Sequence, residues 1–196
     1  MRLIDSDGYG VELTIAGYQF PDHIDPRIRY SWLVIAGTAN CPEGNWTFRW
    51  QALSLDDTVE LADWLGRIAT EAGPSGEGVA GPSGEGVAGP SGEGVAGPSG
   101  EGVAEPSSAA VVGPARLTFT EPNLSLTATR SGGEVELAIG LDLEFSPPWD
   151  RRAAAGSPFI VTTRLPPADI ATAAKDLGAE VDSYLPPGGR LLGRAR

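Results

Sequence analysis

The sequence predicts an α+β domain, with a mainly antiparallel sheet of about six to seven strands and two helices packed on it. Two observations support this class. Three consecutive strand-like segments are followed by a helical pattern, then by four more strand-like segments and a second helical pattern. Consecutive strands without a helix between them are joined as hairpins, which makes their pairing antiparallel.

The first half of the chain contains three predicted strands, at residues 9–20, 30–39 and 45–53. The first alternates apolar and polar residues, as expected of a half-buried strand. Residues 30–39 are apolar on both faces, which indicates a central strand covered on both sides. Residues 45–53 place Trp46, Phe48 and Trp50 on one face, where tryptophan usually fills a core.

A helix is predicted from Ser54 to about Ala72. Ser54 can serve as its N-cap, and Asp56 and Asp57 in the first turn interact favourably with the helix dipole. Apolar residues recur at helical spacing and predict the buried arc: Leu55, Val59, Leu61, Ala62, Leu65, Ile68 and Ala69.

The second half contains four predicted strands, at residues 116–120, 123–129, 133–145 and 157–165. The third has the clearest alternation, with one apolar face formed by Val135, Leu137, Ile139, Leu141, Leu143 and Phe145. Pro167 begins the last predicted helix. Its inner stripe is Ile170, Ala173, Ala174, Leu177, Val181 and Tyr184.

Four copies of the octapeptide GPSGEGVA occupy residues 73–104. Each copy is too poor in apolar surface to offset the entropy of ordering its backbone, and its eight-residue period breaks the Gly spacing that collagen requires. We therefore expect residues 1–72 and 116–196 to form one domain together, and residues 73–115 to be a flexible insertion. The alternative is that the repeat is a ligand for a partner.

The chain is acidic, with a formal net charge of −12. Four of these charges belong to glutamates of the repeat, which leaves −8 on the remainder. This charge argues against binding to nucleic acid or to an anionic membrane and favours a basic partner. The single cysteine, Cys41, allows no internal disulfide, and no signal peptide or membrane span is recognisable. We expect a cytoplasmic protein.

Catalytic signals are sparse, and we expect no enzyme activity, no cofactor and no metal. His23 is the only histidine. Together with Asp22 and Asp25 it would make a poor metal site, and a nucleophilic pair with Cys41 has no evident orienting partner. Glu144 and Asp150 could act as a glycosidase pair, but carboxylates are common on an acidic chain.

The exposed face of the first long helix is the candidate binding surface. On a helical wheel, Asp56, Glu60 and Asp63 lie on a polar face, and Trp64 projects into that face. An exposed tryptophan among acids is typical of an interface anchor. The alternative is that the ring folds against a sheet edge and that the acids are a solvated face. Trp149, predicted in a loop, and Glu144 extend the candidate set.

Several phrases of the sequence together resemble the WapI-like immunity proteins. These are GYQFP at 17–21, GNWTFRW at 44–50, VELADWL at 59–65, LTFTEPNLSL at 117–126 and LDLEFSPPW at 141–149. Members of that family accompany polymorphic toxins and protect the producing cell. The resemblance implies that the chain binds the C-terminal domain of a cognate toxin, and the acidic balance favours a basic, nuclease-type toxin. A non-catalytic module that binds a carbohydrate or a peptide is the alternative.

Overall fold

The computed structural model describes residues 1–72, 114–150 and 157–186. All of them belong to one unit, made of Met1–Gly73 and Gly113–Arg196. Its elements, in chain order, are β1 (Arg2–Ile4), β2 (Gly10–Tyr18), α1 (Pro26–Arg29), β3 (Trp32–Cys41), β4 (Gly44–Ser54), α2 (Leu55–Ala72), β5 (Ala115–Thr118), β6 (Leu124–Ser131), β7 (Glu134–Leu141), the 3-10 helix η1 (Leu143–Phe145), β8 (Phe159–Leu165) and α3 (Pro167–Asp182).

The predicted α+β class is confirmed, and its strands are antiparallel throughout. They form two four-stranded sheets, in the orders β1-β2-β3-β4 and β5-β6-β7-β8, so that each sheet is a meander of neighbouring strands. The division into two sheets was not predicted, and neither was β1. A strand of three residues is too short to show an alternating period. The predicted insertion at 73–115 lies almost entirely outside the described residues, so it stays a prediction.

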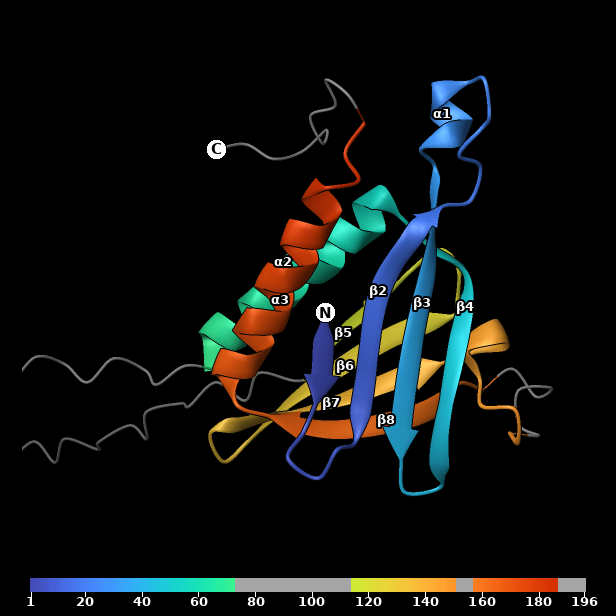
Figure 1. The fold of residues 1–196 in the computed structure, drawn as a ribbon. Helices are drawn as coiled ribbons and strands as arrows, with labels where there is room; N and C mark the ends of the chain where they lie inside the picture. Colours follow the sequence, from blue (N-terminus) through green and yellow to red (C-terminus); the bar gives the residue numbers. More distant parts are fainter. Residues whose placement is uncertain (73–113, 151–156, 187–196) are drawn as a thin grey trace, which may run out of the picture. The chain divides into compact units, whose positions relative to one another are not determined.

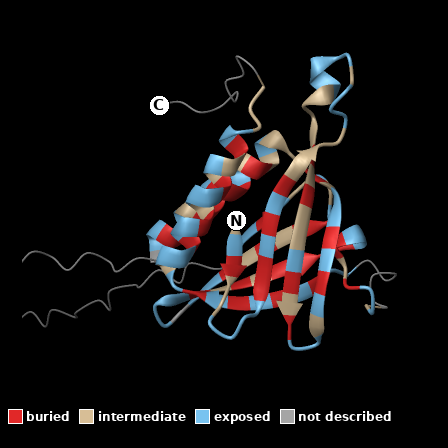
Figure 2. Cartoon of the chain, in the orientation of Figure 1, coloured by how far each residue is buried: buried red, intermediate tan, exposed pale blue. Residues whose placement is uncertain are grey.

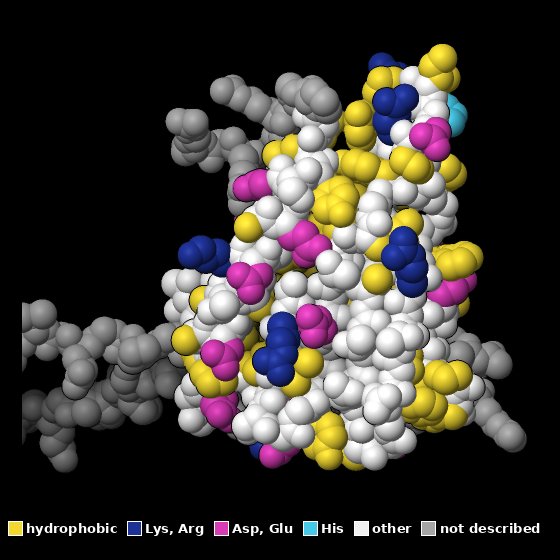
Figure 3. Space-filling model, viewed as in Figure 1, with side chains coloured by type: hydrophobic (Ala, Val, Ile, Leu, Met, Phe, Trp, Pro, Cys, Tyr) yellow, Lys and Arg dark blue, Asp and Glu magenta, His cyan; other side chains and the backbone are white. Residues whose placement is uncertain are grey.

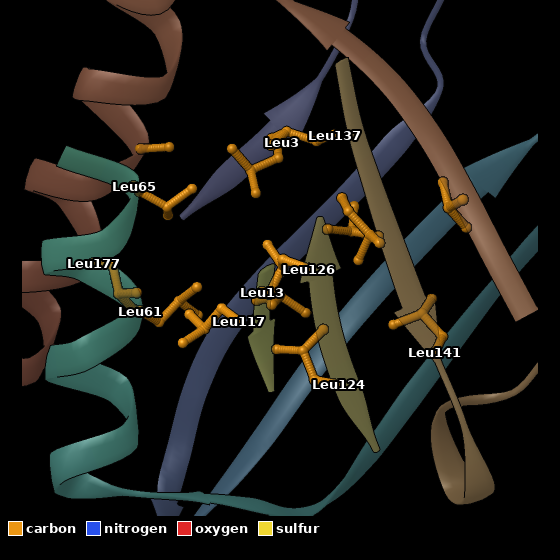
Figure 4. Close-up of a cluster of buried hydrophobic side chains, with 14 of the residues drawn as sticks. Leu3, Leu13, Leu61, Leu65, Leu117, Leu124, Leu126, Leu137, Leu141 and Leu177 are labelled. Carbon is orange, nitrogen blue, oxygen red and sulfur yellow. The ribbon is translucent and has the colours of Figure 1, made fainter. Parts of the chain in front are cut away.

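One hydrophobic core joins both sheets and both long helices. Figure 4 shows its leucines converging from different elements: Leu3 from β1, Leu13 from β2, Leu61 and Leu65 from α2, Leu137 from β7 and Leu177 from α3. In Figure 2 buried and exposed positions alternate along the strands, as expected of sheets with one face in the core. Each fully buried leucine contributes roughly 1.5–3 kcal/mol of transfer free energy.

The helices α2 and α3 pack against each other and cover one side of the core (Figure 1). The predicted cap of α2 is confirmed. Ser54 Oγ accepts a hydrogen bond from the N–H of Asp57 at 3.1 Å, and the Asp57 carboxylate accepts one from the N–H of Ser54 at 2.9 Å. This reciprocal pair satisfies two backbone donors that would otherwise have no partner at the helix start.

The strand predicted to reach Phe145 ends instead at Leu141, and the prediction is wrong beyond that residue. Asp142 stops the strand because its carboxylate accepts a hydrogen bond from the N–H of Leu143 and caps η1. Leu143 then adopts a left-handed backbone, with φ of 51°, and is about half-exposed. Phe145 is nevertheless fully buried, because the turn of η1 returns its ring to the core.

Side chains of α3 complete one edge of the first sheet. The pairing between β1 and β2 continues only to Leu13, whose N–H donates to Met1 O at 3.0 Å. Beyond this point the N–H of Ile15 donates to the Glu180 carboxylate, and the hydroxyl of Tyr184 donates to Ile15 O. These contacts fix the position of α3 relative to the sheet.

Candidate partner-binding surface

Three of the predicted binding residues are exposed on α2. Asp56, Glu60 and Asp63 lie on the side of the helix that faces away from the core. They share that side because positions three, four and seven apart lie on one face of a helix. Asp57, their neighbour in sequence, is committed to the cap and is less exposed.

Trp64 does not belong to this exposed face, and the prediction that it projects into solvent is wrong. Only 4% of its surface is exposed. The buried arc of α2 is wider than one sheet would require, because α2 packs against α3 as well as contacting β4 and β5. Trp64 lies at the margin of that arc, beside the positions of Leu61 and Ile68, and helps to fill the core.

Acidic side chains of α3 extend the charge of α2. The two helices together carry nine acidic and two basic residues. Figure 3 shows Asp and Glu side chains gathered along the α3 side of the view. Glu71 of α2 is also exposed but forms an ion pair with Arg130 at 3.3 Å. We call the other exposed carboxylates of the two helices the helical acidic surface: Asp56, Glu60 and Asp63 on α2, with Asp169, Asp176 and Asp182 on α3.

The α3 carboxylates were missed at the sequence level, although a signal was available. They lie outside the predicted inner stripe of that helix, and their number exceeds that of its single lysine. What the sequence does not show is that α3 packs directly beside α2. Because the two helices are adjacent, their charges contribute to one electrostatic potential.

Glu144 and Trp149 lie elsewhere. Both follow β7, in and after η1, which sits beside β4 on the other side of the sheets from the body of α2 (Figure 1). Glu144 accepts a hydrogen bond from the side chain of Asn123 at 2.9 Å. Trp149 is 43% exposed, with its ring edge-on to Trp46 at a centroid distance of 5.5 Å. The structure therefore does not bring the six predicted residues into one patch.

The outer face of the first sheet is open and slightly hollow. A shallow depression of about 520 Å³ is lined by Thr14, Ala36, Thr38 and Thr47, with Glu12 and Arg49 at its margins. Ala36 is only half-buried, so the predicted cover on both faces of β3 is absent over this depression. Threonine hydroxyls, small side chains and the ring of Phe48 line it, which makes it a shallow, mainly apolar surface of the kind that a protein partner can contact.

His23 and Cys41, considered as a nucleophilic pair, are far apart. His23 precedes β3 and Cys41 ends it, and a strand of ten residues spans roughly 30 Å. Burial raises the pKa of the Cys41 thiol, with Glu43 adding to the shift. A raised pKa keeps the thiol protonated and weakly nucleophilic. Within the described ranges, no group of three or more His, Cys, Asp or Glu side chains is placed to hold a metal ion.

Every helix in the described part of the chain is too short or too polar to cross a lipid bilayer. A family model described as the Immunity protein WapI-like family matches residues 2–185. Among curated proteins, no sequence matches significantly. The family match covers both sheets, both long helices and the acidic face of each helix. An immunity family implies neutralisation of a cognate toxin. The chain belongs to the Immunity protein WapI-like family.

Proposed function

We propose that this protein neutralises a basic, nuclease-type toxin domain in the cytoplasm by binding it through the helical acidic surface. Family membership implies the cognate toxin as partner. The toxin type and the binding site are inferred from the charge of α2 and α3, which together carry nine acidic residues and two basic ones, Arg67 and Lys175.

A surface of this charge suits a nucleic-acid-degrading partner for a physical reason. A nuclease binds its substrate largely through phosphate contacts from lysine and arginine. Carboxylates presented on two rigid helices can occupy the same basic residues and exclude the substrate. They also speed association, because opposite fields steer two proteins together at low salt.

The proposal is tested by reversing charge on α2 while keeping the total charge matched. The variant Glu60→Lys with Asp63→Lys is compared with Asp7→Lys with Glu134→Lys. Both control acids are exposed and lie outside the helices, Asp7 in the β1–β2 turn and Glu134 at the start of β7. Binding to the C-terminal domain of the toxin encoded beside this chain is measured at several salt concentrations. We expect the α2 variant to bind at least tenfold more weakly and with a smaller salt dependence.

The matched variant separates location from net charge. If both double variants weaken binding equally, the effect is a long-range one and α2 is not in the interface. If the α2 variant binds as tightly as the unmodified chain, the helical acidic surface is excluded. Toxin binding by the chain without inhibition of the toxin's nuclease activity would overturn neutralisation itself.

A further inference from the structure

The segment between β2 and β3 exposes three large apolar side chains at one point of the surface. We call residues 20–30 the hairpin tip. Ile24 is 90% exposed, and Phe20 and Ile28 are each 40% exposed. Figure 1 shows α1 standing beyond the ends of β2 and β3, and Figure 3 shows hydrophobic and basic side chains gathered there. Isolated exposed hydrophobic residues are ordinary, but three on one short projection are not.

Hydrogen bonds hold the backbone of the hairpin tip in one conformation. Asp25 caps α1 by accepting a hydrogen bond from the N–H of Arg27 at 2.9 Å. The N–H of Asp25 donates to His23 Nδ1 at 3.0 Å, and Arg29 Nε donates to His23 O at 2.8 Å. The polar groups of His23, Asp25 and Arg29 thus bond within the segment, while its large apolar side chains are exposed. A preorganised backbone lowers the entropy cost of binding through those side chains.

The base of the hairpin tip is joined to the end of α3. The Tyr18 hydroxyl donates a hydrogen bond to Tyr184 O, and the two rings are edge-on at 6.0 Å. Tyr30 packs edge-on to Tyr18 from the other side, at 5.1 Å. The base of the hairpin tip therefore lies near the C-terminal end of α3, which carries Asp182 of the helical acidic surface.

The size of the apolar patch limits what can bind it. Three partly exposed side chains offer only a few hundred Å², whereas a stable protein interface covers roughly 800 Å² on each partner. A second copy of this chain held by the tip alone would bury too little. A partner that also contacts the helical acidic surface buries a larger area, and it gains an apolar contact of the kind that dominates binding energy.

We propose that the hairpin tip is the apolar anchor of the toxin interface, with Ile24 inserted into an apolar pocket on the toxin domain. The inference rests on the proposed function, since it names the same partner. It assigns the two surfaces different roles. The helical acidic surface accelerates association, and the hairpin tip slows dissociation.

The test compares Ile24→Ser with Ile160→Ser. Ile160 is an exposed isoleucine on the outer face of β8, in the other sheet, and therefore controls for loss of surface hydrophobicity. Association and dissociation rates are measured with the same toxin domain. We expect Ile24→Ser to raise the dissociation rate at least tenfold, with an unchanged salt dependence and unchanged melting temperature. Ile160→Ser should bind like the unmodified chain.

The outcomes distinguish the two proposals. If Ile24→Ser dissociates at the original rate while Glu60→Lys with Asp63→Lys still weakens binding, the anchor is overturned and the proposed function stands. If Ile24→Ser and Ile160→Ser lose affinity equally, the effect is not local and the anchor is also overturned. If the unmodified chain does not bind the toxin domain, both proposals fall.

Discussion

The carboxylate of Glu180 on α3 accepts a hydrogen bond from the backbone N–H of Ile15 on β2 at 2.7 Å. The same oxygen accepts one from the hydroxyl of Thr14 at 2.6 Å. The Tyr184 hydroxyl satisfies the carbonyl of Ile15 at 2.8 Å. One side chain of α3 and one just after its end thus replace the strand that β1 does not provide beyond Leu13. An unpaired strand edge attracts other strands, so this arrangement also protects the sheet from aggregation.

Glu180→Ala should lower the free energy of unfolding by about 2 kcal/mol, because it leaves a partly buried N–H without its charged acceptor. Urea denaturation followed by circular dichroism measures the change. Asp176→Ala, one turn earlier and exposed, is the control and should change stability by less than about 0.5 kcal/mol. Equal effects of the two substitutions would show that α3 is held by packing alone.

Tyr18→Phe should destabilise the protein at neutral pH by about 1 kcal/mol, because Tyr184 O loses its donor. Burial raises the pKa of Tyr18 above its usual value near 10, and Tyr30 and Tyr184 add to the shift. The protonated hydroxyl therefore stabilises the fold fully below pH 10, and the contribution is lost as the pH rises through the raised pKa.

Unfolding measured from pH 7 to 11 checks this expectation. The unmodified protein should lose stability above pH 10 more steeply than Tyr18→Phe does. Tyr9→Phe, which alters a tyrosine in the exposed β1–β2 turn, is the control. Parallel pH profiles for Tyr18→Phe and the unmodified protein would contradict the assignment.

Trp64→Ala should cost about 3–5 kcal/mol of stability, because it removes a buried aromatic side chain from the contact region of α2. Trp50→Ala, at a half-exposed position on the edge strand β4, should cost much less. Thermal unfolding of the two variants compares them directly. Trp64→Phe, which keeps most of the packing, should leave toxin affinity unchanged. A large loss of affinity in that variant would show that Trp64 contributes to toxin binding.

Two glycine-to-alanine substitutions should change the stability of the fold in opposite directions. A Cβ atom on Gly37 would lie 2.5 Å from the Phe48 ring and 2.8 Å from Glu12 O. Phe48 cannot move aside, because its ring packs on Phe145 at 4.3 Å. Gly37→Ala should therefore destabilise the fold by about 1–3 kcal/mol.

Gly66 lies inside α2, and a Cβ there would meet no atom within 4 Å. Gly66→Ala should stabilise the protein by roughly 0.5–1 kcal/mol, because alanine favours a helix over glycine. Chemical denaturation of both variants gives the comparison. A destabilising Gly66→Ala, or a neutral Gly37→Ala, would show that the local packing differs from that described.

Regular periodicity made most of the elements predictable. The alternation of β7 identified its buried face, since Val135, Leu137, Ile139 and Leu141 are all fully buried. The stripe of α3 and the cap of α2 were also found, because both depend on neighbours in sequence. Phe145 shows the limit of this reasoning. Its spacing from Leu141 fits a strand, but a hydrogen bond from the N–H of Leu143 to the Asp142 carboxylate ends that strand.

The errors arose where two distant segments meet. A helical wheel assumes one buried arc, and Trp64 fell outside it because the wheel does not include α3. The three apolar residues of the hairpin tip were not predicted to be exposed. Phe20, Ile24 and Ile28 are spaced four residues apart, as on a helix, but only the short helix α1 (Pro26–Arg29) forms in this segment, so only the structure shows that they project from the domain. Partner binding by any of these surfaces stays a prediction.

The contact between Ile15 and Glu180 spans 165 positions of the chain, so the first sheet depends on a helix that is synthesised long after β2. Contacts this distant in sequence slow folding, because a long loop must close before they form. During synthesis, β2 leaves the ribosome long before α3 does. The α3 half of the helical acidic surface is therefore synthesised after the α2 half, and a nascent chain presents the whole helical acidic surface only once α3 has left the ribosome.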